Sequence, residues 1–514
     1  MSRISYLRKT PEGWSQSIRR MVSLNGLSLE PAEAREIVQY LSNRHGLAPE
    51  ELRPALYEVE RRHLSERPDM PEIVRSTCTV CHSLGRIATQ RRTPGEWELL
   101  TATHRGLYPL IDRQVFRRGS VPEEEGDFEF PMDAAAARLA NTYPLHTSEW
   151  ADWSRNMRPA RLAGTWAVRG YEVGRGPFFG TVSVEPLADR ADEFTTTARY
   201  VYPAEGAEVT RGGEGLVYTG YQWRGRSIGQ GGEHPELREV MFVERDWRTM
   251  HGRWYTGAYD ELGVDVRLER VDGGPVVLGT YPDRVRAGTE ATLTLFGVEL
   301  PGTLGTTEVD LGAGVEVLGV SDVRPDRATV RVRVAAGASE GARDVLVPGA
   351  RTGGALVVYD AVDYIRVEPH PALAHTGGVI RAPGHARFEA IGYTAGPDGR
   401  QGNEDDIRIG AMPARWSLVE YPRTYDDDDV AFVGTIDDRG RFMPALDGPN
   451  PERSGNRNNI GEVWVAAEYV PEGAEAGAAP LRARGYLVVS PPVYMDWDGQ
   501  TTTLQATEQD GGHR

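Results

Sequence analysis

Both cysteines of the chain fall within five residues, as Cys78 and Cys81, and His82 follows directly. Cys-x-x-Cys-His is the attachment signature of c-type haem. In such a site the two thiols add across the vinyl groups of the porphyrin, and the adjacent imidazole binds the iron. The sequence therefore predicts covalent haem at Cys78 and Cys81, an axial ligand at His82, and electron transfer as the chemistry.

Two other kinds of site use closely spaced cysteines. A structural zinc site needs four ligands, usually from a second Cys or His pair, and the sequence has no third cysteine. A thioredoxin-like redox pair needs a βαβ setting, whereas the segments that flank Cys78 look helical and charged. A chance match is a poor explanation, because these are the only two cysteines. Haem attachment is the interpretation that fits.

A segment at the N-terminus recurs later in the chain. Residues 3–14 (RISYLRKTPEGW) align with residues 86–97 (RIATQRRTPGEW) at a constant offset of 83. Two such segments indicate two copies of one small helical haem unit. The equivalent of Cys78 in the first copy would fall before residue 1. We therefore expect either a start that is set too late or a variant that has lost the first haem; a late start would also explain why no signal peptide is seen.

The two copies carry different candidate ligands at one shared position. Met21 and His104 each stand seven residues after the Trp of their repeat, 83 residues apart. Haem c iron takes Met or a second His opposite the first His. Met raises the reduction potential of the haem relative to His. We predict His104 as the distal ligand of the haem at Cys78, and Met21 as that of a first haem. The alternative for Met21 is a Met that packs in the core of an amphipathic helix. The alternative for His104 is a helix-end cap or a solvated side chain. The competing residues are His45, His63, Met70 and Met132.

The elements that must position these residues are predicted to be helices. Ser28 is expected to cap a helix that runs through residues 34–41 and ends near Gly46. Residues 54–64 and 93–105 show a similar helical pattern. The fold class is therefore predicted to be multidomain, with an all-α cytochrome c-like domain that holds both repeats over residues 1–160.

After about residue 160 the sequence changes to short alternating stretches of aromatic and β-branched residues, separated by Gly-rich turns. We predict three all-β domains here. The first is an antiparallel barrel or sandwich over residues 161–272. Two immunoglobulin-like sandwiches follow over residues 273–360 and 361–495. Residues 496–514 are expected to form a loose polar tail.

The composition excludes several classes of protein. A length of 514 residues suggests three or four domains. The formal net charge of -17 argues against nucleic-acid binding, which needs a basic face. No stretch of about 18 apolar residues occurs, so no membrane span is expected. No Ser/His/Asp set, phosphate loop or pair of catalytic carboxylates emerges, so we expect no bond-making chemistry from this chain alone.

Two acidic segments could have other roles. Residues 398–406 place carboxylate and amide oxygens at short intervals in a Gly-rich turn, as calcium loops do. They lack the EF-hand spacing, so calcium binding and a solvated acidic hairpin both stay open. The run from Asp426 to Asp429 is expected to be an exposed loop, because charge runs usually are.

Taken together, these motifs resemble one family. The segment 3–14 followed by Met21, the Cys-x-x-Cys-His copy with its own repeat segment, and three β domains in this order are similar to the alpha (dihaem cytochrome c) subunit of quinohemoprotein amine dehydrogenase. The resemblance covers nearly the whole chain. It departs from the family in lacking the first Cys-x-x-Cys-His, which puts the first haem in doubt and, with it, the exit of electrons to the acceptor.

The resemblance implies a periplasmic heterotrimer that oxidatively deaminates primary amines. A small partner subunit would carry cysteine tryptophylquinone, a β-propeller subunit would help to enclose it, and this chain would pass electrons from the quinone to a soluble cytochrome c or cupredoxin. It also implies haem at Cys78, Cys81 and His82, with His104 and Met21 as distal ligands. The alternative is a haem-bearing binding or redox-sensing protein whose β-sandwiches grip a partner, without dehydrogenase subunits.

Overall fold

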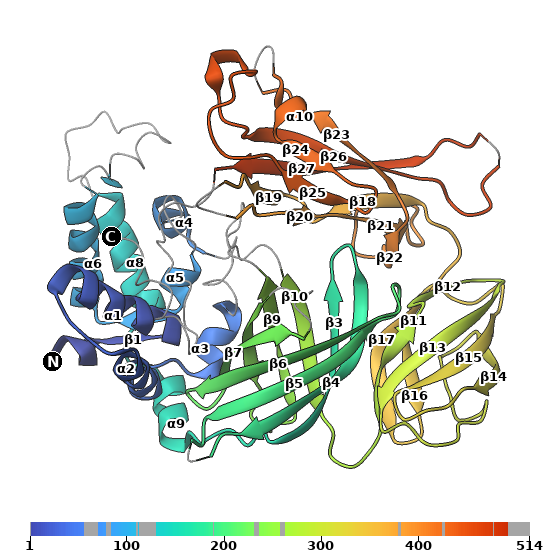
Figure 1. Ribbon diagram of the computed structural model, residues 1–514, viewed down its shortest axis with the longest axis horizontal. Helices are drawn as coiled ribbons and strands as arrows, with labels where there is room; N and C mark the ends of the chain where they lie inside the picture. The colour runs from blue at the N-terminus through green and yellow to red at the C-terminus, as the bar shows by residue number, and fades with distance from the viewer. Residues whose placement is uncertain are drawn as a thin grey trace.

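The computed structural model describes residues 2–55, 70–78, 84–108, 111–112, 130–188, 190–230, 236–256, 263–378, 382–423, 427–475 and 477–491. Helices gather at the N-terminal side of the molecule, and β domains make up the rest (Figure 1). A closed barrel lies beside the helices, strands β11 to β17 form the unit beyond it, and β18 to β27 lie above both (Figure 1). The predicted layout of N-terminal helices followed by β domains is confirmed.

The helical region is built from short elements joined by one small sheet. Its elements are η1 (Ser2–Tyr6), β1 (Leu7–Lys9), α1 (Pro11–Asn25), α2 (Pro31–Arg44), α3 (Pro49–Leu52), η2 (Arg53–Ala55), α4 (Glu72–Cys78), α5 (Gly85–Ala88), β2 (Gln90–Arg92), α6 (Pro94–Leu107), α8 (Pro131–Thr142) and α9 (Ser148–Asn156). Residues 93–105 form a helix as predicted, in α6. Most of the predicted helix over 54–64 lies outside the described residues.

The helix ends follow local chemistry. Thr10 caps α1 and Thr93 caps α6, each with its side-chain oxygen accepting from a backbone N–H in the first turn and with Pro at the first helical position. The predicted Ser28 cap is wrong. Helix α2 begins at Pro31, and Glu30 is its cap: the Glu33 carboxylate accepts from the Glu30 N–H at 2.9 Å in a capping box.

The barrel closes an antiparallel sheet in sequence order. Its strands are β3 (Gly164–Glu172), β4 (Gly176–Pro186), β5 (Glu193–Tyr202), β6 (Ala207–Tyr218), β7 (Gln222–Gly229), β8 (Leu237–Val243), β9 (Thr249–Thr256) and β10 (Gly263–Arg270), and β10 pairs back with β3. Closure leaves no open edge among these strands. Alternate residues point inward and fill the interior, including Trp166, Trp223 and Trp254. Gly215 gives Trp223 its room, because a Cβ there would lie 2.1 Å from the ring.

The next unit packs two sheets around one apolar core. Its strands are β11 (Val276–Tyr281), β12 (Arg284–Arg286), β13 (Glu290–Val298), β14 (Val315–Ser321), β15 (Arg327–Val334), β16 (Gly341–Val347) and β17 (Ala350–Tyr359), arranged as sheets β11-β13-β15-β14 and β12-β17-β16. The core between the sheets is rich in Val and Leu. Phe179 of the barrel stacks on Phe296 of this unit, with the ring centroids 4.8 Å apart, so the two units are in contact here.

The last unit has three small sheets around a separate core. Its elements are β18 (Tyr364–Glu368), β19 (Ala372–His375), β20 (Ala386–Arg387), β21 (Glu389–Thr394), β22 (Ile407–Met412), β23 (Arg415–Glu420), α10 (Asp429–Phe432), β24 (Gly434–Ile436), β25 (Arg441–Pro444), η3 (Ser454–Asn456), β26 (Gly461–Tyr469) and β27 (Leu481–Ser490). The Tyr171 hydroxyl of the barrel donates to the Glu389 carboxylate at 2.9 Å and so links the barrel to this unit.

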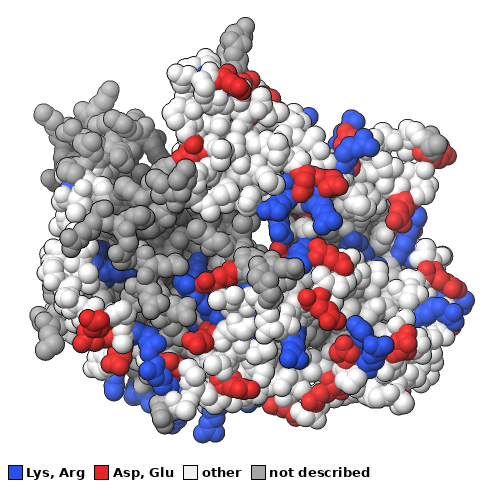
Figure 2. Space-filling view, in the orientation of Figure 1, with Lys and Arg blue, Asp and Glu red and all other residues white. Residues whose placement is uncertain are grey.

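Charged side chains on the β domains are mixed in sign. On the face shown in Figure 2, acidic and basic groups lie next to one another over these domains. Several form ion pairs, such as Arg175 with Glu205 at 2.8 Å and Arg333 with Glu290 at 2.7 Å. Among the described residues, no helix is both long and apolar enough to cross a membrane.

Candidate functional site

The sequence repeat is a structural repeat with a local two-fold axis. Strands β1 and β2 pair antiparallel, and Arg8 lies opposite Arg91, its own equivalent 83 residues later. The helices exchange bonds in the same reciprocal way. The Thr10 N–H donates to the Thr89 carbonyl at 3.3 Å, and the Thr93 N–H donates to the Tyr6 carbonyl at 3.4 Å. Two copies of one unit therefore face each other across this small sheet.

Each repeat holds its Trp in the same manner. Trp14 donates from Nε1 to the His45 carbonyl at 3.0 Å, and Trp97 donates to the Tyr143 carbonyl at 3.4 Å. Both indoles are almost fully buried, at 2% and 1% exposure. The conserved geometry means that Met21 and His104, seven residues further along α1 and α6, occupy equivalent places on the two helices.

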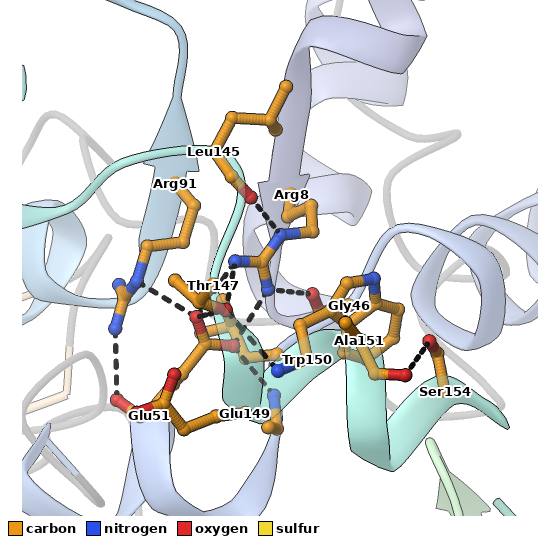
Figure 3. Close-up of polar contacts among 12 residues, drawn as sticks. Arg8, Gly46, Glu51, Arg91, Leu145, Thr147, Glu149, Trp150, Ala151 and Ser154 are labelled. Atoms are coloured by element: carbon orange, nitrogen blue, oxygen red, sulfur yellow. Dashed lines mark hydrogen bonds and ion pairs between the residues drawn. The ribbon is translucent and has the colours of Figure 1, made fainter. Parts of the chain in front are cut away.

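One carboxylate holds both repeat arginines together (Figure 3). Glu51 accepts from Arg8 at 2.7 and 2.8 Å and from the Thr147 hydroxyl at 2.9 Å, and Arg91 lies 3.3 Å away. The Ala48 N–H donates to the same carboxylate at 2.8 Å. Burial alone would raise the pKa of Glu51, but the hydrogen bonds and charges of the two arginines hold it below its ordinary value. This network fixes the axis between the copies.

A cavity of about 430 Å³ lies between α1 of the first repeat and α6 and α8, within the size range of cofactor pockets. Cys78, at the end of α4, lines one wall and His104 lines another. Its apolar lining includes Ile87, Leu100 and Leu139.

The Cys78 thiol is half-buried, and burial raises its pKa to about 12. The thiol itself is therefore not an activated nucleophile, which suits a structural attachment point better than thiol-based redox catalysis. The other two residues of the motif, Cys81 and His82, lie outside the described residues.

His104 is oriented as a metal ligand would be. Its Nδ1 lies 2.8 Å from the Leu100 carbonyl, which can only accept, so Nδ1 carries the proton and the lone pair of the neutral ring is on Nε2. Burial lowers the pKa of His104, and the charges of Arg20 and Arg92 lower it further, against the opposing effect of the bond to Leu100. Burial therefore favours the neutral imidazole, which is the form that binds iron.

The competing ligands are placed differently. Met132 of α8 is 6% exposed and lines the same cavity, so it is a second candidate for the distal ligand there. Met70 is buried outside the lining, with its sulfur 3.6 Å from the Tyr143 hydroxyl, and His45 packs edge-on against Trp14. His63 lies outside the described residues.

Met21 stands on the outer surface of α1, at 46% exposure, and does not line this cavity. Asn25 donates to its sulfur at 3.6 Å. The structure thus separates Met21 from Cys78 and His104, as the assignment to a different haem requires.

The donor set and the lining fit haem c. Apolar walls suit the macrocycle, a thiol and an imidazole face the space, and basic side chains could pair with the propionate carboxylates.

The acidic segments have ordinary structural roles. In the loop between β21 and β22, Asp406 accepts from the Gly402 and Asn403 N–H groups at 2.6 and 3.1 Å, so its carboxylate already closes a turn. The expectation of an exposed loop at 426–429 is wrong for Asp429, which is 6% exposed and ion-paired with Arg453 at 2.5 Å. Carboxylates of Glu420, Asp427 and Asp429 lie close together, and Arg453 is ion-paired with Asp429 of this group.

A duplicated helical unit, a cavity bearing Cys78 and His104, and appended β domains define a multidomain haem-binding protein. The comparisons with known families then place it. Residues 1–150 match the haem-binding domain of quinohemoprotein amine dehydrogenase A, alpha subunit, and residues 159–271, 274–360 and 365–500 match domains II, III and IV of the same subunit. The chain belongs to the family of quinohemoprotein amine dehydrogenase alpha subunits.

Solved structures add little to this. The chain is similar to a redesigned beta barrel (14% identity, 22% of this chain and 92% of that chain, TM-score 0.19) and to a de novo fluorescence-activating beta barrel (18%, 22% and 96%, TM-score 0.18). It is also similar to a gamma-CGTase from Alkalophilic bacillus clarkii (8% identity, 61% and 41%, TM-score 0.16). These TM-scores support no argument about fold or function. No match was found among curated protein sequences.

Proposed function

We propose that this chain is the electron-transfer subunit of a periplasmic quinohemoprotein amine dehydrogenase, an oxidoreductase that acts on primary amines. It would take electrons from cysteine tryptophylquinone on a small partner subunit and deliver them to a soluble cytochrome c or cupredoxin. A β-propeller subunit would complete the heterotrimer. The observation that carries the proposal is the cavity that brings Cys78 and His104 together from separate helices.

The residues divide the work of holding the cofactor. Cys78 and Cys81 would form the thioether links, His82 would be the proximal ligand and His104 the distal one. Haem c would supply one-electron redox chemistry when bound. Trp97, at 1% exposure, and the apolar lining would keep water from the iron, while the bond from Nδ1 to Leu100 holds the His104 ring in place.

A surface in the first repeat supports Met21 as the distal ligand of a further haem. Three exposed apolar residues are repeat equivalents of cavity-lining residues: Ile4 of Ile87, Met21 of His104, and Leu24 of Leu107. Their exposures are 36%, 46% and 67%. Their equivalents in the second repeat line one cavity, so the repeat relation supports a second haem on the α1 side.

The β domains are proposed to be the scaffold for partner subunits. We infer immunoglobulin-like topology for the units over residues 273–360 and 361–495, after a barrel over 161–272 and the haem domain over 1–160. No catalytic residue is assigned to this chain, since amine oxidation would take place at the quinone.

The test begins with attachment. Replacing Cys78 and Cys81 with Ala should remove covalent haem, measured as loss of the haem-stained band in a denaturing gel. A stained band of wild-type intensity would overturn the attachment site. His104→Ala should open a coordination position, so that carbon monoxide binds the reduced protein and shifts its Soret band. His45→Ala is the matched control and should leave the spectrum unchanged. A His104→Ala protein that remained low-spin and unreactive would transfer the distal role to Met132.

A further inference from the structure

The cavity that holds Cys78 and His104 has an unusually one-sided charge. Its described lining contains five basic residues and neither Asp nor Glu. The basic residues come from both repeats: Lys9, Arg19 and Arg20 from the first, Arg86 and Arg92 from the second. Helix α1 of the first repeat therefore forms part of the wall of a site whose Cys and His ligands belong to the second repeat.

Lys9 is a buried member of this group of cations. Lys9 is 6% exposed, donates to the Ser17 hydroxyl at 2.7 Å and lies 5.5 Å from the Trp14 ring centre. Burial, and then the charges of Arg92 and Arg20, lower the pKa of Lys9 well below its ordinary value. Lys9, Arg92 and Arg20 therefore lie close enough for their charges to oppose one another.

These five cations differ in whether a carboxylate or another acceptor lies beside them. Arg92 has Glu96 at 3.7 Å, and Arg86 donates to the Gln16 side-chain oxygen. Arg20 lines the cavity as an exposed residue, and no ion pair with a described carboxylate offsets its charge. Arg20 is also the charge with the largest effect on the pKa of His104. Arg20 therefore lines the same cavity as His104 and has no described countercharge.

We infer that Arg20, from the first repeat, raises the reduction potential of the haem held by Cys78 in the second repeat. The inference rests on the proposed haem site. Reduction adds one electron to ferric iron and lowers the charge of the centre by one, and a nearby cation stabilises the reduced form relative to the oxidised form. The effect is stronger where few countercharges lie nearby, as among the described residues that line this cavity.

The coupling has a functional consequence. A bis-His haem has a lower potential than a His/Met haem, so an electron passing from the second repeat to a Met21-ligated haem would go downhill by a large step. Arg20 would narrow that step to the extent that it raises the reduction potential of the haem at Cys78 more than that of a haem at Met21. It sits one residue before Met21 on α1, so a single helix would adjust both haem sites.

The experiment is a spectroelectrochemical titration of the purified full chain with its haem attached. Arg20→Thr puts at this position the residue type that the second repeat carries at Thr103, and Arg20→Lys keeps the charge. Arg44→Thr, at the exposed end of α2, is the control for loss of one distant charge. We expect a lower midpoint potential for Arg20→Thr, a still lower one for Arg20→Glu, and near wild-type values for Arg20→Lys and Arg44→Thr.

The absorption spectrum separates this inference from the proposed function. If Arg20→Thr carries one haem per chain with an unchanged low-spin spectrum and an unchanged midpoint, the inference is wrong while the haem site stands. If the wild-type chain carries no covalent haem, the proposed function fails first. A shift that occurs equally in Arg20→Lys would show that packing rather than charge is responsible and would also overturn the inference.

Discussion

Replacing Glu51 with Gln should destabilise the haem domain more than any comparable surface change. The Glu51 side chain is 5% exposed. It pairs with Arg8 and Arg91, whose side chains are 4% and 6% exposed. The Gln side chain has nearly the same shape, but it leaves two buried guanidinium groups without a countercharge and turns an NH2 donor toward one of them. Removing one partner of a buried ion pair typically costs about 3–5 kcal/mol.

The lower figure applies here, because the Leu145 and Gly46 carbonyls still accept from Arg8, at 2.7 and 3.1 Å. A loss of about 3 kcal/mol corresponds to a decrease of roughly 100-fold in the folding equilibrium constant. Because the chain has several domains, the assay should follow a signal from the haem domain alone, such as the Soret band during urea unfolding.

The neighbouring Glu50 offers a matched control. It is 48% exposed and pairs with Arg245 at the surface, an arrangement worth about 0–1 kcal/mol. Glu50→Gln should therefore leave the unfolding midpoint nearly unchanged. If Glu51→Gln had an effect as small as Glu50→Gln, the network in Figure 3 would not be what holds the two repeats together.

The stabilisation by Glu51 also depends on pH in a defined direction. Its pKa in the folded state lies below the ordinary value of 4.5. The contribution is therefore fully present above pH 4.5 and is lost as the pH falls through the lowered folded-state pKa. The difference in stability between wild type and Glu51→Gln should shrink in that acidic range. A difference that grew on acidification would contradict this assignment of charge.

Two further changes test the barrel. Gly215→Ala would place a Cβ 2.1 Å from the Trp223 ring, so overpacking should lower barrel stability by about 1–3 kcal/mol in urea unfolding followed by Trp fluorescence; an unchanged midpoint would show that the ring can move away. Burial raises the pKa of Glu239, which accepts from Trp223 at 2.9 Å, so the charged form is disfavoured in the barrel. Glu239→Gln should then stay within about 1 kcal/mol of wild type at pH 7, and a much larger loss would indicate that Glu239 is needed as an anion.

Local sequence signals predicted the parts of the site that local chemistry determines. The Cys-x-x-Cys-His motif and the 83-residue repeat predicted that His104, on α6, belongs to the same site as Cys78. The repeat also predicted the equivalence of Met21 and His104. The change in pattern near residue 160 predicted the switch from helices to strands. These features depend on residue spacing along the chain, which the sequence displays directly.

Contacts between distant segments were not predictable in the same way. In the sequence, Asp429 is one member of an acidic run. In the structure it forms an ion pair with Arg453, and the missing side chain of Gly461 leaves room for its carboxylate. Glu51 gives no local sign that it joins Arg8 to Arg91, although two arginines at the same repeat position were a signal that could have been followed.

We propose that this chain carries electrons from an amine-reduced quinone through its own haem. The most direct measurement is stopped-flow absorbance of the haem when a primary amine is mixed with the chain assembled with its quinone-bearing and β-propeller partners. Haem reduction should follow amine addition in the complex, should not occur with the chain alone, and should be lost in Cys78→Ala/Cys81→Ala. Delivery of electrons to the soluble acceptor at the wild-type rate in that double variant would contradict the claim.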